Sequence, residues 1–288
     1  MKRAQGINWP GIIPFIAVHL VGFATPFLVA PTWGLVALAV GAYYVRMFGI
    51  TAGYHRYFAH RAYRTSRAFQ FALAWLGATA SQKGALWWAA HHRDHHRYSD
   101  TEDDIHSPLV GGFLWSHVGW IVDRGYEGTN HDRVKDLTKY PELLWIERNW
   151  WVPPATLAVG LFLAGGWAWV LWGFFLSTTA LWHGTFVINS LAHVIGSRRY
   201  ETSDGSRNSF VLALVTMGEG WHNNHHFYPG TANQGFFWWE WDPSYYVLRG
   251  LAALGLVWDL RTPPLKVKFA HLDGGRAPEV QPAADAAG

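Results

Sequence analysis

The sequence contains no cysteine and little charge. The absence of Cys among 288 residues excludes disulfides, thiolate metal sites and cysteine nucleophiles. Charged residues make up 15% of the chain, against roughly 25% in a typical soluble domain. Half of the residues are hydrophobic and 19 are Trp, so we expect an integral membrane protein. The formal net charge of +3 is too small to indicate a nucleic-acid partner, and we expect none.

Four stretches are apolar enough to cross a bilayer, which takes roughly 20 such residues. They cover about residues 11–30, 33–50, 150–164 and 167–190. The third stretch is short and relies on Trp150 and Trp151 as interfacial anchors. Pro31 and the pair Gly165 and Gly166 predict turns, so the four spans form two hairpins.

The positions of Lys and Arg predict the topology. All 23 lie within residues 1–3, 46–148 and 198–276. By the positive-inside rule, both termini and both long polar segments then lie in the cytoplasm. Residues 51–149 and 191–272 would form a helical cytoplasmic cap, whose apolar stretches 69–90 and 245–258 lie in the interface without crossing. We expect one all-α domain over residues 1–272 in the inner membrane of a bacterium, and a disordered tail over 273–288.

Most of the 16 histidines are clustered. His55 and His60 form an H-x4-H motif, two H-x-x-H-H motifs follow, and His193 lies four residues after Asn189. The two H-x-x-H-H motifs comprise His92, His95 and His96, and His222, His225 and His226. On a helix, positions i, i+3 and i+4 share a face, so each H-x-x-H-H motif can direct three imidazoles at one volume. His55 and His60 are roughly 140° apart on an ideal helix; they reach one metal only near a helix end, or they serve two metals.

Nine imidazoles from separate chain positions suit two metal ions with four or five nitrogen ligands each. The fourth span reaches far enough, because 26 residues from Trp167 to His193 extend about 39 Å and the hydrocarbon core is about 30 Å thick. Imidazole alone does not distinguish zinc, copper, iron and nickel. A structural zinc site needs only four ligands, so nine favour a dinuclear redox centre. One such cluster alone is also typical of a solvated helix face, but three clusters on one predicted side are hard to explain as packing.

Seven histidines lie outside these motifs. We expect His19, His183 and His271 to be packing or surface residues, and spacing leaves His91, His106, His117 and His131 undecided.

The motifs as a set resemble the membrane acyl desaturases of the stearoyl-CoA, delta-9 type. The matching segments are 53–60, 92–96, 116–120, 189–193, 218–226 and 234–239. The resemblance implies four transmembrane helices under a cytoplasmic cap that holds a diiron site. It also implies that the nine clustered histidines bind the two irons and that Asn189 acts through a bound water. The implied reaction places a cis double bond, most often at carbon nine, in a saturated acyl chain, and it consumes dioxygen and two electrons.

The chemistry agrees with this resemblance. A methylene group has no acidic proton and no leaving group, so acid–base side chains cannot start the reaction; the metal and dioxygen must. Selecting one position requires a narrow apolar tunnel, and Trp88 and Gln82 match family positions near its bend. Asp104 and His106 match a segment after the second motif, and Glu219 lies beside the last one. We expect these three to support the ligands, because ligating imidazoles usually bond a carboxylate or carbonyl through their other nitrogen.

The chain also departs from the animal members of the family. The animal enzymes hold coenzyme A with an Arg-Asp pair, and this sequence has Ala90 and His91 at those positions. The animal enzymes also have a second basic pair, of which this sequence keeps one residue, Arg124. The acyl carrier is therefore open between coenzyme A, which we favour, acyl carrier protein and an intact lipid. No electron-transfer segment is fused to the chain, so we expect a separate donor such as ferredoxin, rubredoxin or cytochrome b5 with its reductase.

Two other functions compete with this reading. A diiron hydroxylase acting on a lipid or alkane would share the hydrogen abstraction and differ only in the product. A metal transporter or sensor would use the histidines for binding alone. Transport predicts polar residues along the spans, but the predicted ligands lie outside the spans, which favours an enzyme.

Overall fold

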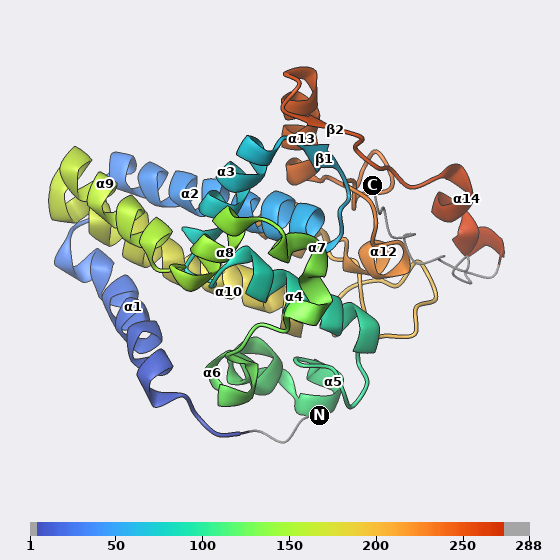
Figure 1. Cartoon of the computed structure of the whole chain (residues 1–288), viewed down its shortest axis with the longest axis horizontal. Coiled ribbons are helices and arrows are strands. Elements are labelled where there is room, and N and C mark those ends of the chain that lie inside the picture. Colours follow the sequence, from blue (N-terminus) through green and yellow to red (C-terminus); the bar gives the residue numbers. More distant parts are fainter. Residues whose placement is uncertain (1–4, 274–288) are drawn as a thin grey trace.

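Long helices dominate the computed structural model, which describes residues 5–273. The four main ones are α1 (Trp9–Leu28), α2 (Trp33–Phe48), α9 (Val152–Val170) and α10 (Ser177–Ser190). They extend to one end of the molecule, and shorter elements such as α5, α12 and α14 lie at the other (Figure 1). Apart from its first residue, the tail predicted to be disordered lies outside the described residues.

Both helices of the N-terminal pair begin at a side-chain cap. The Asn8 side chain accepts a hydrogen bond from the backbone N–H of Gly11 at 3.3 Å, and Thr32 Oγ1 accepts from Leu35 at 3.2 Å. Such oxygens satisfy backbone donors that the first helical turn leaves free. Pro31, which has no backbone N–H, lies in the connection between the two helices, where the sequence predicts a turn.

The second helical pair reverses at its glycines. Gly165 and Gly166 depart from helical geometry, and Gly166 has φ 65° and ψ −158°, a conformation that side chains with a Cβ disfavour. Beyond this break, a Cβ built on Gly173 would lie 3.1 Å from Leu161. Twelve residues of straight helix would separate these positions by about 18 Å. The chain therefore folds back at the predicted turn.

Within residues 5–273, three continuous helical stretches are long and apolar enough to cross a membrane. They are Trp9–Leu28, Trp33–Ala59 and Val152–Ser190, and the last contains both the third and the fourth predicted spans. The apolar stretches 69–90 and 245–258, which we expect to lie in the interface, are not among these three helical stretches. The stretch 69–90, for example, is divided between α3 (Arg67–Ala78) and α4 (Ala85–Tyr98). These lengths and compositions fit a membrane protein.

The remaining elements are mostly shorter and lie mainly in the two segments that the sequence predicts to form the cap. The segment after α2 contains the π-helix η1 (Gly49–Ala59), β1 (Arg64–Thr65), α3, α4, α5 (Pro108–Gly111), η2 (Trp115–Gly119), α6 (Trp120–Val122), η3 (Arg124–Tyr126), η4 (His131–Val134), α7 (Lys135–Thr138) and α8 (Pro141–Arg148). The π-helix η5 (Leu171–Leu176) joins α9 to α10. The segment after α10 contains α11 (Phe210–Val215), α12 (His222–Phe227), α13 (Pro243–Ala253), β2 (Val257–Trp258), α14 (Leu265–Lys268) and η6 (Ala270–Asp273).

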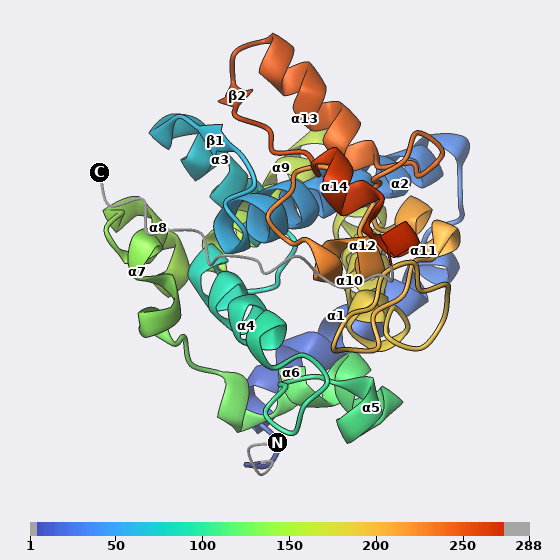
Figure 2. The same cartoon turned by 90° about the vertical axis from the view of Figure 1, so that its right-hand side faces the viewer.

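The two cap segments are joined by strand pairing and a shared core. β1 pairs antiparallel with β2, with Arg64 opposite Trp258 and Thr65 opposite Val257. The largest buried cluster contains residues from both segments, among them Phe58, Leu86 and Leu248. Figure 2 shows the same proximity, with α13 and β2 above α3 and β1. The cap is thus one body, which fixes the relative positions of distant histidines.

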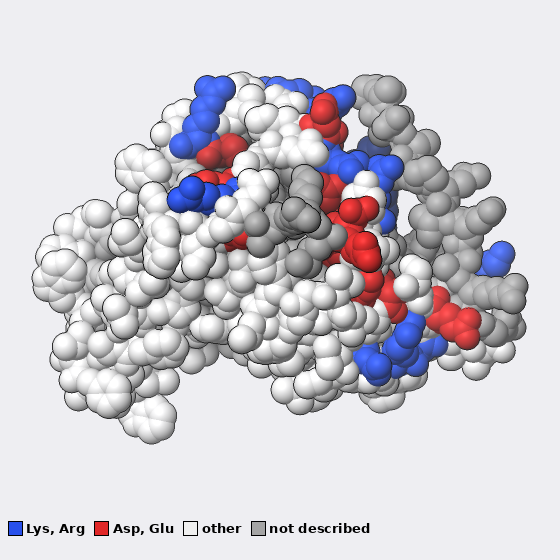
Figure 3. Space-filling view, turned by 90° about the horizontal axis from the view of Figure 1, so that it is seen from below, with Lys and Arg blue, Asp and Glu red and all other residues white. Residues whose placement is uncertain are grey.

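Charge is unevenly distributed over the surface. In Figure 3, Lys, Arg, Asp and Glu gather on one part of the molecule, and the end at left, formed by the long helices, shows none. This pattern follows from the sequence, since no Lys or Arg lies within residues 4–44 or 149–197. The uncharged end is the part whose surface suits hydrocarbon.

Candidate metal centre

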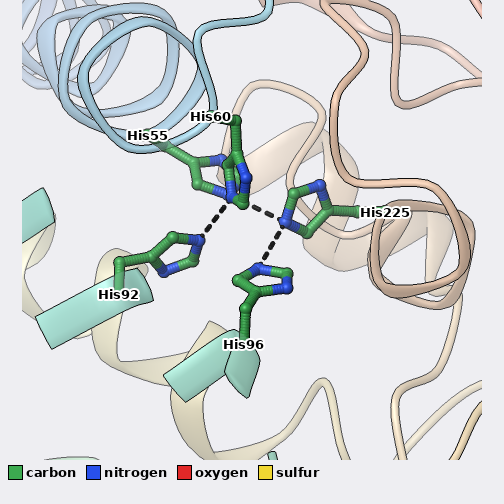
Figure 4. A group of neighbouring side chains, drawn as sticks. All are labelled: His55, His60, His92, His96 and His225. Carbon is green, nitrogen blue, oxygen red and sulfur yellow. Dashed lines mark hydrogen bonds between the residues drawn. The ribbon is translucent and has the colours of Figure 1, made fainter. Parts of the chain in front are cut away.

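Nine histidines from four parts of the chain converge into two groups. Within each of two groups, one nitrogen per ring lies within 4.8 Å of the others. The five-histidine group comprises His55, His60, His92, His96 and His225, and the four-histidine group comprises His95, His193, His222 and His226. Figure 4 shows the five-histidine group, with rings from η1, α4 and α12 pointing toward one another. These are the nine histidines that the sequence motifs single out.

A π-helix explains the H-x4-H motif. His55 lies in η1 and His60 directly follows it, and the backbone N–H of His60 donates to the carbonyl of His55 at 3.2 Å. This i→i+5 bond is the π-helical pattern, and it brings residues five apart onto one face. The two ring centroids are 4.8 Å apart. Both rings therefore belong to the same group, so the alternative that they serve two metals does not fit.

Each H-x-x-H-H motif is divided between the groups, which differs from the expectation that all three imidazoles share one volume. In α4, His92 and His96 join the five-histidine group and His95 joins the other. At about 100° per residue, positions i and i+4 are only about 40° apart on a helix. Position i+3 is about 60° from i and 100° from i+4, so its ring reaches the neighbouring volume.

The same division occurs in α12. His222 and His226, four residues apart, belong to the four-histidine group, and His225 belongs to the five-histidine group. Two short helices thus contribute to both groups, which places the groups side by side. The arrangement matches the predicted total of four or five nitrogen donors for each of two ions.

The Nε2 atoms have the spacing of ligands that share an ion. His225 Nε2 lies 3.0 Å from that of His55 and 2.8 Å from that of His96. In the other group, the Nε2 atoms of His193 and His222 are 3.0 Å apart. Two imidazole nitrogens at right angles, each about 2.1 Å from one ion, would be about 3.0 Å apart. The donor set is therefore compatible with a metal site.

Carboxylates hold the opposite side of four rings. The Nδ1 atoms of these rings pair with Glu219 (His55, 2.6 Å), Asp104 (His95, 3.0 Å), Asp100 (His193, 2.8 Å) and Asp204 (His226, 2.7 Å). When Nδ1–H donates to a carboxylate, the lone pair is on Nε2, which is the nitrogen directed at the group. Each carboxylate thus selects the tautomer that can bind a metal.

Burial keeps most of these imidazoles neutral. It lowers the pKa of His60, His92 and His222 well below the ordinary value, and the neighbouring rings lower each pKa further. Burial also lowers the pKa of His95, but the carboxylates of Asp104, Asp100 and Asp204 together outweigh it and leave that pKa raised. Neutral imidazole is the metal-binding form. In addition, His226 Nε2 is buried with no hydrogen-bond partner among the described residues, which a bound ion would supply.

The predicted supporting residues lie beside the groups. Asp104 and Glu219 bond rings of the two groups as described above, and the His106 ring centroid is 4.3 Å from that of His95. Asn189 borders a small cavity together with residues of both groups, and its backbone carbonyl accepts a hydrogen bond from Ser116 Oγ at 2.7 Å. Asn189 thus lies beside both groups, and its action through a water stays a prediction.

Sequence reasoning missed three residues. Asp100 and Asp204 bond the rings of His193 and His226, which are 93 and 22 positions away. The Gln234 amide lies 3.3 Å from His55 Nδ1 and 3.4 Å from His225 Nδ1. No spacing rule marks partners so distant, although the segment containing Gln234 is among those that resemble the family.

A cavity of about 940 Å³ leads from the groups toward the long helices. Its lining includes both predicted substrate contacts, Gln82 and Trp88. Trp88 stacks on His92 with ring centroids 4.9 Å apart, and its Nε1 donates to Gln82 Oε1 at 3.4 Å. Arg124 is exposed and absent from this lining, and its Nε donates to the carbonyl of Ile7 at 3.1 Å. The structure therefore places Trp88 and Gln82 together and Arg124 apart.

Three histidines outside the groups form a line of their own. The His183 ring lies between two others, with Nε2 3.2 Å from His19 Nε2 and Nδ1 3.0 Å from His117 Nε2. His19 and His183 are thus packing residues that also bond each other, as expected in part from the sequence. Because His183 uses opposite nitrogens for its two neighbours, the line is not a convergent ligand set.

Comparisons with known proteins agree with this site. The family model described as fatty acid desaturase matches residues 30–240. An sn-2 palmitoyl-lipid 9-desaturase from Nostoc sp. (strain 36) is 34% identical over 87% of this chain and 89% of its own length. An sn-1 stearoyl-lipid 9-desaturase from Anabaena variabilis is 34% identical over 88% and 94%. An acyl-CoA 5-desaturase from Anemone leveillei is 34% identical over 85% and 77%.

Proposed function

The chain belongs to the fatty acid desaturase family, and from this premise we propose its metal, its reaction and its setting. It is an oxidoreductase that acts on fatty acyl groups. We propose that it places a cis double bond at carbon nine of a long saturated acyl chain. The observation that carries this proposal is the pair of histidine groups at the end of an apolar cavity.

The proposed cofactor is a pair of iron ions. The five-histidine group would hold one and the four-histidine group the other, with Asn189 acting through a water. When bound, the irons supply the activation of dioxygen and the removal of two hydrogen atoms, which acid–base side chains cannot perform. Iron is favoured by the family; the imidazole donor set fits iron but does not by itself select it over zinc, copper or nickel.

The side chains of the protein position the acyl chain and exclude water. The apolar lining, with Trp88 stacked on a ligand ring, would hold one pair of methylenes beside the groups. Gln82 is held in place by a bond from its Nε2 to Thr185 Oγ1 at 2.9 Å. Carboxylates keep the ligand rings in the metal-binding tautomer, as the distances to Nδ1 indicate.

The proposed setting is the inner membrane of a bacterium. The four helical segments would cross it as two hairpins, and the termini and metal centre would lie in the cytoplasm. The absence of Lys and Arg from residues 4–44 and 149–197 and their abundance elsewhere support this orientation. Electrons would come from a separate donor such as ferredoxin, rubredoxin or cytochrome b5 with its reductase.

Fatty acid analysis tests this function. The chain is expressed in a host whose membrane lipids are saturated at carbon nine, and methyl esters are separated by gas chromatography with double-bond positions mapped. We expect a new cis-9 monoenoic acid. Iron-loaded protein that yields no monoenoic acid, or that yields a hydroxy acid instead, would contradict the proposal.

A further inference from the structure

The cavity beside the metal centre is flanked by the first halves of two long helices, α1 and α9. α1 lines it with Gly11, Pro14 and Val18, and α9 lines it with Ala155 and Ala158. On each helix these residues recur every three or four positions, which places them along one face. One face of each helix is therefore turned toward the cavity.

Beyond the cavity, both helices are held against the π-helix η5. Thr25 Oγ1 of α1 donates to the carbonyl of Leu171 at 3.3 Å, and a Cβ built on Gly173 would lie 3.1 Å from Leu161 of α9. Phe174 of η5 lines the cavity. The two helices run to the same end of the molecule (Figure 1), and η5 bounds the cavity where they meet it.

The edge of the cavity is exposed on both helices. Pro14 and Ala155 line the cavity and are exposed, and so does Trp151, which is 58% exposed. Next to this edge, Ile13 and Val159 lie outside the lining and are 65% and 57% exposed. The lining thus continues into the outward surfaces of α1 and α9, and the cavity is open between them.

The surroundings of this opening are apolar. Gly11, Ala155 and Ala158 have no side-chain atoms beyond Cβ, so they leave the opening wide. The segments 9–28 and 152–170 contain no charged residue, and both belong to stretches long and apolar enough to cross a membrane. When these helices span a bilayer, the opening faces hydrocarbon.

The same cavity reaches the metal centre. Its lining includes His92, Trp88, which stacks on His92 with ring centroids 4.9 Å apart, and Asn189 beside both histidine groups. One continuous space therefore connects the outward surface of the long helices with the two histidine groups.

From these contacts we propose that the opening between α1 and α9 is a lateral portal, bordered by Gly11, Pro14, Trp151 and Ala155. The saturated acyl chain of the substrate passes through it from the bilayer to the metal centre, and the product leaves the same way. Along this route the chain exchanges one apolar environment for another and is not exposed to water. The inference rests on the proposed desaturase function and adds the path of the acyl chain, whatever group carries that chain.

Spin labels test the portal without turnover. Because the chain has no cysteine, one introduced thiol takes a single label. Ala155→Cys places it at the portal, and the matched control Val159→Cys places it one turn further, outside the lining. The protein is held, without an electron donor, in vesicles of an ether lipid with methyl-branched chains, which lacks the straight acyl chain of the substrate. Collisions with dioxygen and with a water-soluble nickel complex are measured before and after addition of stearoyl-CoA or a distearoyl glycerolipid.

We expect the label at position 155 to collide mainly with dioxygen, and at least one of the two substrates to reduce these collisions. The label at position 159 should not respond. More collisions with the nickel complex than with dioxygen at position 155 would place the opening in water and refute the portal. Collisions with dioxygen that neither substrate changes would also refute it. Failure of the desaturase function would instead appear as no monoene from the unaltered chain.

A bulky side chain at the portal tests the route during turnover. Ala155→Trp narrows the opening, and Val159→Trp makes a comparable enlargement on the outward surface of the same helix. We expect Ala155→Trp to lower kcat/KM several-fold, because this ratio includes the entry of free substrate. Iron content and Tm should match those of Val159→Trp. Equal kcat/KM values in the two variants would contradict entry between α1 and α9.

Discussion

Each histidine of the two groups has one nitrogen committed to its group, and in four of them a carboxylate fixes the other. The two groups differ in the number of carboxylates that bond their rings. Among the described residues, three carboxylates pair with rings of the four-histidine group and one, Glu219, pairs with a ring of the five-histidine group. Glu219 is itself paired with the buried Arg56 at 3.1 Å. The two proposed ions would therefore experience different charge, with more negative charge near the four-histidine group.

Removing a ligand from either group should abolish turnover. We expect His225→Ala to empty the five-histidine group and His95→Ala to empty the other, each lowering desaturation at least about 100-fold, because the metal carries the reaction. His271→Ala is the control, since that ring packs on Tyr200 with centroids 5.6 Å apart. Product analysis and iron content measure the effect, and full activity in His95→Ala or His225→Ala would show that the ligands are misassigned.

Neutralising one carboxylate should weaken one ion selectively. In the structure, Asp204 Oδ1 accepts from the Ser206 N–H at 3.0 Å, and Oδ2 accepts from His226 Nδ1. Asp204→Asn keeps the first bond, but its NH2 group replaces Oδ2 and cannot accept from His226. Loss of such a partner typically lowers metal affinity about 10–100-fold. We expect Asp204→Asn to release one iron per chain at lower chelator concentration, and Glu219→Gln to release the other.

The control for both changes is Glu201→Gln, an exposed carboxylate. Iron content after dialysis against graded chelator measures the release. If Asp204→Asn retained both irons as tightly as Glu201→Gln, the carboxylate would not support a ligand.

The sequence was sufficient to identify the histidines and insufficient to identify half of their partners. Spacing on a helix is a local property, and the motifs of His92–His96 and His222–His226 are local. Asp100 and Asp204 reach their rings only through the folded cap. Asp104 was predicted from the family resemblance, and it lies only nine residues after the His95 ring that it bonds. Glu219 was predicted because it lies beside the last histidine motif.

At the scale of elements, the π-helix η1 decides the geometry of the first motif. An ideal α-helix separates His55 and His60 by roughly 140°, which left the number of metals open at that motif. The i→i+5 bonding in η1 removes this separation. Hydropathy and residue spacing do not distinguish the π-helix η1 from the α-helix that precedes it, so η1 could not be predicted from the sequence.

Close packing of η1 on α3 gives a test of this element. A Cβ on Gly49 would lie 2.8 Å from the backbone nitrogen of Gly77 and 2.9 Å from the carbonyl carbon of Leu76. Because backbone atoms cannot turn aside as side chains do, we expect Gly49→Ala to cost about 1–3 kcal/mol of stability. Thermal unfolding of the purified protein should show a Tm several degrees lower.

Gly41→Ala is the matched control in the same helical stretch. A Cβ at Gly41 would meet nothing within 4 Å, and alanine favours helix by up to about 1 kcal/mol over glycine. We expect its Tm to be unchanged or higher. A Gly49→Ala protein as stable as Gly41→Ala would contradict the tight contact between η1 and α3.

For the whole molecule, composition predicted the helical class, and Gly165 and Gly166 predicted a turn. The structure confirms the helical class and the break at these glycines, whereas the cytoplasmic cap stays a prediction. The convergence of the cap segments follows from the β1–β2 pairing and the common core, contacts between residues nearly 200 positions apart. The hydrophobic pattern does not specify such pairings. The sequence therefore did not show how the nine histidines divide into the five-histidine and four-histidine groups.

The most direct test of the central claim locates the metal. Crystals of the iron-loaded protein are measured at the iron absorption edge, and an anomalous difference map is calculated. We predict two peaks per chain, one enclosed by His55, His60, His92, His96 and His225 and the other by His95, His193, His222 and His226. A single peak, or peaks away from these rings, would contradict it.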